Sequence, residues 1–198
     1  MLEKLAEVTR NNKMLAEAAK AWRRLYDMGE NSTYREQAAA QYVDATLADG
    51  YDEAIVAMAD DVASLADVAQ DARRRSQFAK AGVLERQGDS EAALEIYNNL
   101  RNVVSDNVGA ESAYRVILSL YQKGDAVAAE DQIYAFSDSK TPHTYWLGKA
   151  FILLGNIYAE KGDDFQAKAT YQSIIDGYMP SDDGVVAEAK QRLSALNK

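Results

Sequence analysis

Four glycines recur at nearly constant spacing along the chain. Gly50, Gly88, Gly124 and Gly162 are separated by 38, 36 and 38 residues (88−50, 124−88, 162−124). An aspartate follows each of the last three, whereas the first is preceded by one, in the order Asp49-Gly50. Glycine adopts the left-handed backbone conformation that ends many helices, and aspartate can cap the helix that follows. The spacing therefore predicts a series of helix–turn–helix units.

Side chains repeat at the same interval as the glycines. Five residues after the last three glycines comes an alanine, and nine residues after them comes a large side chain: Ala93, Ala129 and Ala167, then Tyr97, Ile133 and Tyr171. Repeats of this length are typical of solenoids, in which each unit buries its apolar face against its neighbours.

The clearest unit runs from residue 151 to residue 174. Helical spacing puts two apolar sets on facing sides of two helices: Phe151, Leu154, Gly155 and Tyr158 in the first, then Ala167, Tyr171 and Ile174 in the second. The small residues Gly155 and Ala167 are expected to let the helices touch, while the rings interlock beside them. A large side chain at position 155 is therefore expected to overpack the pair.

This unit resembles the tetratricopeptide repeat (TPR) signature, Trp-x2-Leu-Gly-x2-Tyr-x8-Ala-x3-Phe-x2-Ala. Its slots are occupied by Phe151, Leu154, Gly155, Tyr158, Ala167 and Tyr171, and Ile174 departs from the last one. The resemblance covers roughly residues 12–196 and weakens toward the N-terminus. It implies an all-α fold, an α-solenoid of antiparallel helix pairs forming a right-handed superhelix of about 9–11 helices.

We expect one solenoid over the whole chain. Its parts are a leading half repeat (1–30), a degenerate repeat (31–65), three repeats (66–108, 109–142 and 143–181) and a closing helix (182–198). The leading half is expected to contain a short helix over 2–9 and a longer one over 12–27. A capping box formed by Thr33 and Glu36 is expected to open the next helix. A later helix over 90–104 is expected to be followed by a turn over 105–109.

The segments 141–147, 162–168 and 178–181 resemble the C-terminal part of long bacterial TPR proteins of the cell envelope. That resemblance implies the periplasm or envelope of a Gram-negative bacterium, with the cytoplasm as an alternative. It also leaves open whether the chain is part of a longer protein.

Charge and composition argue against several classes of partner. A formal net charge of −9 disfavours nucleic acid, which requires a basic surface. The chain has no cysteine, which excludes disulfides and thiolate metal sites. The longest apolar run, residues 150–155, is far shorter than the roughly 20 residues of a membrane-spanning helix, so no membrane insertion is expected.

Residues for catalysis are also not evident. His143 is the only histidine, and its place after Pro142 at a helix start suits a structural role. The aspartate pairs at 60–61, 163–164 and 182–183 lack calcium-loop spacing and suit helix capping. No phosphate-binding glycine loop or nucleophile elbow occurs. We therefore expect no catalytic, metal or cofactor site and no enzymatic activity.

The TPR resemblance implies that function resides in a concave groove lined by the first helix of each pair. The flank facing that groove would carry Phe78, Glu85, Arg115, Ser119, Gln122, Lys149, Ile152 and Asn156. Its mixed polar and apolar character suits an extended or helical peptide. The expected function is a non-enzymatic scaffold that binds a protein or peptide partner. The alternatives are a solvated surface without a ligand, and a structural or self-assembly arm of a larger envelope protein that forms homo-oligomers.

Overall fold

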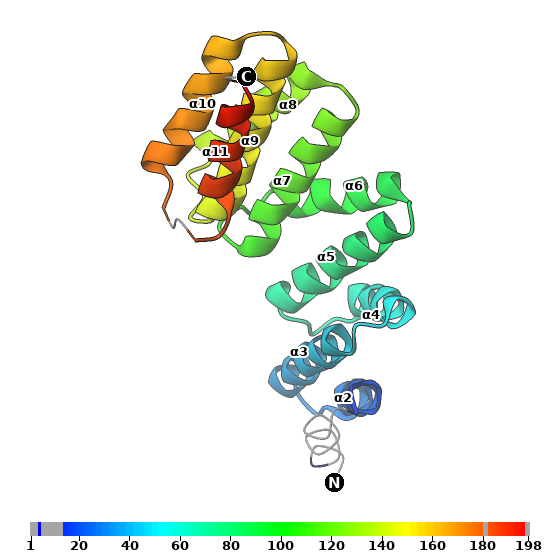
Figure 1. The fold of residues 1–198 in the computed structure, drawn as a ribbon. Coiled ribbons are helices and arrows are strands. Elements are labelled where there is room, and N and C mark those ends of the chain that lie inside the picture. The colour runs from blue at the N-terminus through cyan, green and yellow to red at the C-terminus, as the bar shows by residue number, and fades with distance from the viewer. Residues whose placement is uncertain (1–3, 5–13, 180–181, 197–198) are drawn as a thin grey trace. The chain divides into compact units, whose positions relative to one another are not determined.

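The computed structural model describes residues 4, 14–179 and 182–196. Within them the chain forms ten helices and no strand (Figure 1), which confirms the predicted all-α class. The helices are α2 (Leu15–Met28), α3 (Ser32–Asp49), α4 (Asp52–Ser64), α5 (Gln70–Arg86), α6 (Ser90–Leu100), α7 (Asn107–Gln122), α8 (Ala126–Asp138), α9 (Thr144–Glu160), α10 (Asp164–Gly177) and α11 (Val185–Ala195). The helix predicted over 2–9 lies almost entirely outside the described residues.

The same turn ends α5, α7 and α9. Gly88, Gly124 and Gly162 have positive φ angles of 86°, 78° and 76°. In each turn the amide of the next aspartate donates to a carbonyl five residues back, over 2.9, 3.0 and 2.9 Å at Asp89, Asp125 and Asp163. The carboxylate of each aspartate then accepts from the amide three residues on, those of Ala92, Ala128 and Gln166, over 3.1–3.2 Å. Both halves of the predicted Gly-Asp turn are thus confirmed: one ends a helix and the other caps the next.

Gly50 also has a positive φ, 75°, but its turn is different because its aspartate precedes it. The Gly50 amide donates to the Thr46 carbonyl over 3.2 Å. Tyr51, at the N-cap of α4, offers no side-chain cap.

Two predicted boundaries and one predicted cap are wrong. The Thr33 capping box does not open α3, because Asn31 is the extended residue (φ −140°, ψ 163°) and its side chain accepts from the Tyr34 amide over 2.9 Å. Residues 105–109 are not all turn, because the Asp106 carboxylate accepts from the Gly109 amide over 2.7 Å and α7 begins at Asn107. Helix α6 ends at Leu100, four residues before the predicted end.

The chain divides into two compact units, Met1–Ile96 and Tyr97–Lys198. In the N-terminal unit the most extensive packing is between α2 and α3 and between α4 and α5. Alanines dominate the α2–α3 contact, whereas Val43, Met58 and Val62 join α3 to α4.

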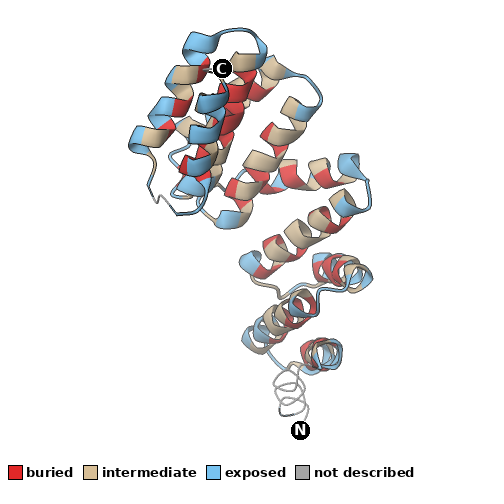
Figure 2. Ribbon diagram, viewed as in Figure 1, coloured by how far each residue is buried: buried red, intermediate tan, exposed pale blue. Residues whose placement is uncertain are grey.

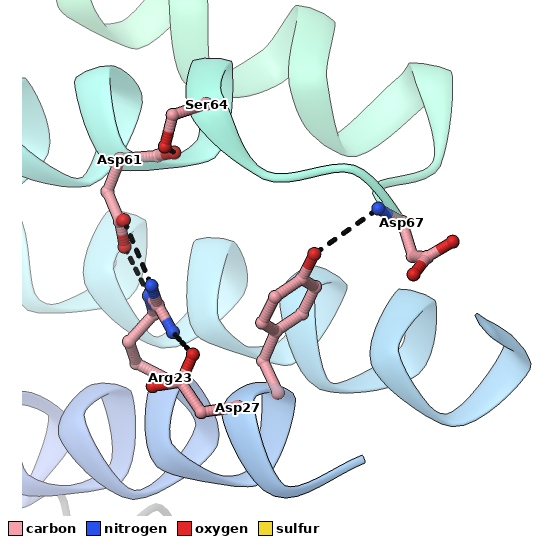
Figure 3. Close-up of polar contacts among 6 residues, drawn as sticks. Arg23, Asp27, Asp61, Ser64 and Asp67 are labelled. Atoms are coloured by element: carbon pink, nitrogen blue, oxygen red, sulfur yellow. Dashed lines mark hydrogen bonds and ion pairs between the residues drawn. The ribbon is translucent and has the colours of Figure 1, made fainter. Parts of the chain in front are cut away.

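Polar contacts tie α2 to later parts of this unit (Figure 3). The Arg23 guanidinium binds the carboxylates of Asp27 and Asp61, so that it links α2 to α4. The amide of Asp67, in the loop before α5, donates to the Tyr26 hydroxyl over 3.2 Å.

In the C-terminal unit, α9 lies at the centre of the packing. It contacts α7, α8, α10 and α11, and buried residues cover most of its circumference (Figure 2). One core joins buried residues of α7, α8 and α9: Ala110, Ala113, Ile117, Ala129, Ile133, Phe136, Ala150, Leu153, Leu154 and Ile157.

Gly155 lies directly against the Tyr171 ring of α10. A Cβ atom at this glycine would come within 2.3–2.8 Å of three ring carbons, whereas real Cβ contacts are rarely closer than about 3.4 Å. Ala167 on α10 is fully buried. The predicted close approach of the two helices is confirmed, and the ring that requires it is identified as that of Tyr171.

Gly155 and Gly82 provide a matched pair of helix-interior substitutions. Gly155→Ala places a methyl group against Tyr171 and is expected to lower the free energy of unfolding by about 1–3 kcal/mol, and Gly155→Leu by at least as much. At Gly82 of α5 an added Cβ meets only the Arg86 guanidinium, at 3.6 Å. Gly82→Ala is therefore expected to raise stability by about 0.5–1 kcal/mol. Chemical denaturation of the three variants measures both signs, and an unchanged midpoint for Gly155→Leu would contradict the close packing.

Candidate partner-binding surface

The structure places the predicted groove residues on α5, α7 and α9. Phe78 and Glu85 are half-buried on α5 in the N-terminal unit. The others lie in the C-terminal unit: Arg115 and Ser119 are half-buried and Gln122 is exposed on α7, while α9 carries Lys149, Ile152 and Asn156.

Helix α11 covers the α9 flank that was predicted to face a groove. Ile152 is only 1% exposed and packs with Ile174 of α10 and with Val185 and Ala189 of α11. Ile152 is therefore a core residue of this unit.

Asn156 is also buried and has a structural partner. Its side-chain oxygen accepts a hydrogen bond of 2.7 Å from the Tyr171 hydroxyl. The same tyrosine ring covers Gly155, so neighbouring α9 residues support its ring and its hydroxyl. Burial raises the pKa of Tyr171 to about 12.

Lys149 remains at the surface and joins α9 to α11. Its ammonium group forms an ion pair with Glu188, and both side chains are about a quarter exposed (23% and 30%). Burial opposes the charged ammonium, but the Glu188 carboxylate outweighs it and raises the pKa of Lys149. Arg192 on the next turn of α11 lies 3.7 Å from the same carboxylate.

An aromatic cluster lies beside Lys149. Trp146 packs against Tyr114 of α7, with ring centroids 5.5 Å apart, and edge-on against Tyr145, at 4.8 Å. The Trp146 indole donates to the Asn107 side chain over 2.9 Å, and Tyr145 is 37% exposed. Sequence reasoning missed these residues, although Asn107–Trp146 and Lys149–Glu188 are each 39 residues apart, close to the repeat length.

The charges and rings of three helices meet at one surface. Burial chiefly raises the pKa of Tyr114, and Lys149, Glu188, Arg115 and Tyr145 all lie close enough to influence it. Arg115 is paired on its own helix with Glu111, over 2.9 Å. We call this the α7–α9–α11 surface, defined by Tyr114, Arg115, Tyr145, Trp146, Lys149 and Glu188. Its groups can stack on a ligand and form hydrogen bonds or ion pairs with it.

The other candidate groups have local partners. His143 lies at the N-cap of α9 without a side-chain cap, and its ring contacts the Ser105 carbonyl at 3.2 Å. Across the described part of the chain, no three histidine or carboxylate side chains are grouped to hold a metal ion.

Comparison with models of known protein families and with curated protein sequences finds no match. None of the helices in the described ranges has both the length and the apolar character needed to cross a membrane.

The Tyr171–Asn156 contact predicts a pH dependence of stability. Tyr171 ionises near its ordinary pKa of 10.0 in the unfolded chain but near 12 in the folded one. Below pH 10 it is neutral in both states, so its stabilising effect is complete there. That effect is lost as the pH rises from 10 toward 12, because only the unfolded chain ionises.

Thermal melts at pH 8 to 11 test this expectation. The melting temperature of the unmodified chain should fall more steeply above pH 10 than that of Tyr171→Phe. At neutral pH, Tyr171→Phe should cost about 1–3 kcal/mol because the buried Asn156 oxygen loses its donor. Tyr51→Phe, at a 61% exposed ring, serves as the control. Parallel alkaline profiles for the unmodified chain and Tyr171→Phe would contradict the burial of an un-ionised Tyr171.

Proposed function

We propose that this chain is a non-enzymatic scaffold of TPR-like helix pairs that binds a partner protein or peptide. The partner lies on the α7–α9–α11 surface, which corresponds to the concave groove of TPR proteins. A right-handed superhelical arrangement of the pairs belongs to the same proposal.

The observation that carries the proposal is the composition of this surface. The partly exposed ring of Tyr145 lies near the cationic side chains of Arg115 and Lys149. Each cation is already oriented by a carboxylate, that of Glu111 or of Glu188. Aromatic and arginine side chains supply much of the binding energy at protein interfaces. Pre-oriented side chains lose less conformational entropy when a ligand binds.

Because Ile152 and Asn156 are buried, a partner could contact fewer of the predicted groove residues. A partner would meet Tyr145, Lys149 and the α11 residue Glu188 rather than the middle of the α9 flank. Phe78 and Glu85 belong to the N-terminal unit and are proposed as partner contacts only by analogy with the other repeats.

A structural or self-assembly arm is the second candidate. Val127 and Phe165 occupy equivalent positions three residues after Gly124 and Gly162, and they are 67% and 78% exposed. The proposal for this candidate is that these exposed apolar side chains contact another protein surface, including that of a second copy.

Affinity capture with purified full-length chain separates the two candidates. Arg115→Glu combined with Tyr145→Ala is expected to lose a partner retained by the unmodified chain, because the charge and the aromatic contact are both removed. Phe165→Ala is the matched control on α10 and should retain that partner. Unchanged capture by Arg115→Glu/Tyr145→Ala, together with concentration-dependent sedimentation that Phe165→Ala abolishes, would contradict the scaffold and favour the assembly arm.

A further inference from the structure

A hollow lies in the N-terminal unit, between α2 and α4 and over α3. Its volume is about 410 Å³. Small side chains form the walls, Ala16 and Ala19 on α2 and Ala54 and Ala57 on α4, and Tyr42 is on α3. We call this hollow the α2–α3–α4 groove.

A smaller hollow in the C-terminal unit, over α7, has a volume of about 260 Å³. There Gln132 and Phe136 line the hollow, and Arg101 donates to the Gln132 side chain over 2.6 Å. In α4 the residue before the buried Met58 is Ala57, whereas in α8 the residue before the buried Ile133 is Gln132. Ala57 thus takes up less space beside its groove than Gln132 takes up beside the smaller hollow.

An ion pair of Arg23 joins α2 to α4 beside the groove. Arg23 spans from α2 to the Asp61 carboxylate of α4, as Figure 3 shows, and Asp27 also holds its guanidinium. The charge of Arg23 is therefore already compensated. Tyr42 is nearby, and its pKa is raised to about 12 by burial and by Asp61.

The α2 wall carries two further cations, which no carboxylate in the described part of the chain compensates. Lys20 and Arg24 both line the groove, are exposed, and are one helical turn apart. Within the described residues neither forms an ion pair or hydrogen bond. Among the described residues that line the groove, Asp49 is the one carboxylate. A cationic rim beside apolar alanine walls is therefore present on a chain whose net charge is −9.

We propose that the α2–α3–α4 groove binds an acidic amphipathic segment of a partner protein. Large apolar side chains of that segment enter between the alanine walls, and its carboxylates pair with Lys20 and Arg24. The apolar walls supply most of the affinity through burial, and the cationic rim selects for acidic ligands. This surface is independent of the α7–α9–α11 surface, because none of its residues belongs to the C-terminal unit.

The test uses the full-length chain and two fluorescent helix-forming peptides, read by anisotropy. One peptide carries leucine along one face and glutamate on both flanks; the other has lysine in place of every glutamate. The glutamate peptide is expected to bind at least about tenfold more tightly than the lysine peptide, and to weaken as salt is raised.

Two variants separate the charge from the shape of the groove. Lys20→Glu combined with Arg24→Glu should weaken binding of the glutamate peptide by about tenfold or more. Ala57→Trp should do the same by filling the groove while the charges stay. Lys123→Glu combined with Lys190→Glu makes the same change in net charge at exposed lysines of the C-terminal unit and should leave the affinity unchanged. Helicity by circular dichroism verifies that each variant is folded.

Several results would overturn the proposal. They are equal binding of the two peptides, failure of the glutamate peptide to bind, or insensitivity to both groove variants. A photoreactive residue at position 57 identifies the occupant directly. Cross-linking to the glutamate peptide supports the proposal, whereas persistent cross-linking to residues 1–13 of the same chain or to a second copy contradicts it.

Discussion

The rest of the structure depends on one backbone turn that both ends a helix and starts the next. At Gly88, Gly124 and Gly162 the left-handed conformation lets the following aspartate amide reach back to a helix carbonyl. The aspartate carboxylate then caps the next helix, so that a three-residue connection satisfies polar groups of two helix ends. Because glycine adopts this conformation without a steric cost, the chain can reverse at these positions.

The turns set the direction of the helices, and small residues set the distance between them. Gly155 lets the Tyr171 ring pack against the α9 backbone, and the side chain of the next residue, Asn156, accepts a hydrogen bond from the Tyr171 hydroxyl. The packing of α11 on the same helix then buries Ile152 and leaves Lys149 at the margin, paired with Glu188. Core formation and the composition of the α7–α9–α11 surface are thus two results of the same contacts.

Local features were predictable from the sequence, and contacts between distant segments were not. The Gly-Asp turns and the buried alanines depend on residues a few positions apart, so the spacing of those residues was sufficient to predict them. The start of α3 was misassigned because Asn31 and Thr33 can both cap a helix, and the choice depends on which residue is extended. Likewise, no glycine marks the end of α6. The burial of Ile152 and Asn156 and the contacts of Trp146 depend on helices up to 39 residues away, which periodicity within one helix does not reveal.

Amide hydrogen exchange, measured residue by residue, tests the central claim that identical Gly-Asp turns join these helices. The amides of Asp89, Asp125 and Asp163 each donate inside a turn, so the account predicts slow exchange at all three, comparable to the adjoining helices. In the described part of the chain the amide of Tyr51, which follows Gly50, donates to no carbonyl, so it should exchange faster than these three. Fast exchange at the three aspartates, at the rate of an unstructured loop, would contradict the repeated turn and the helix pairing built on it.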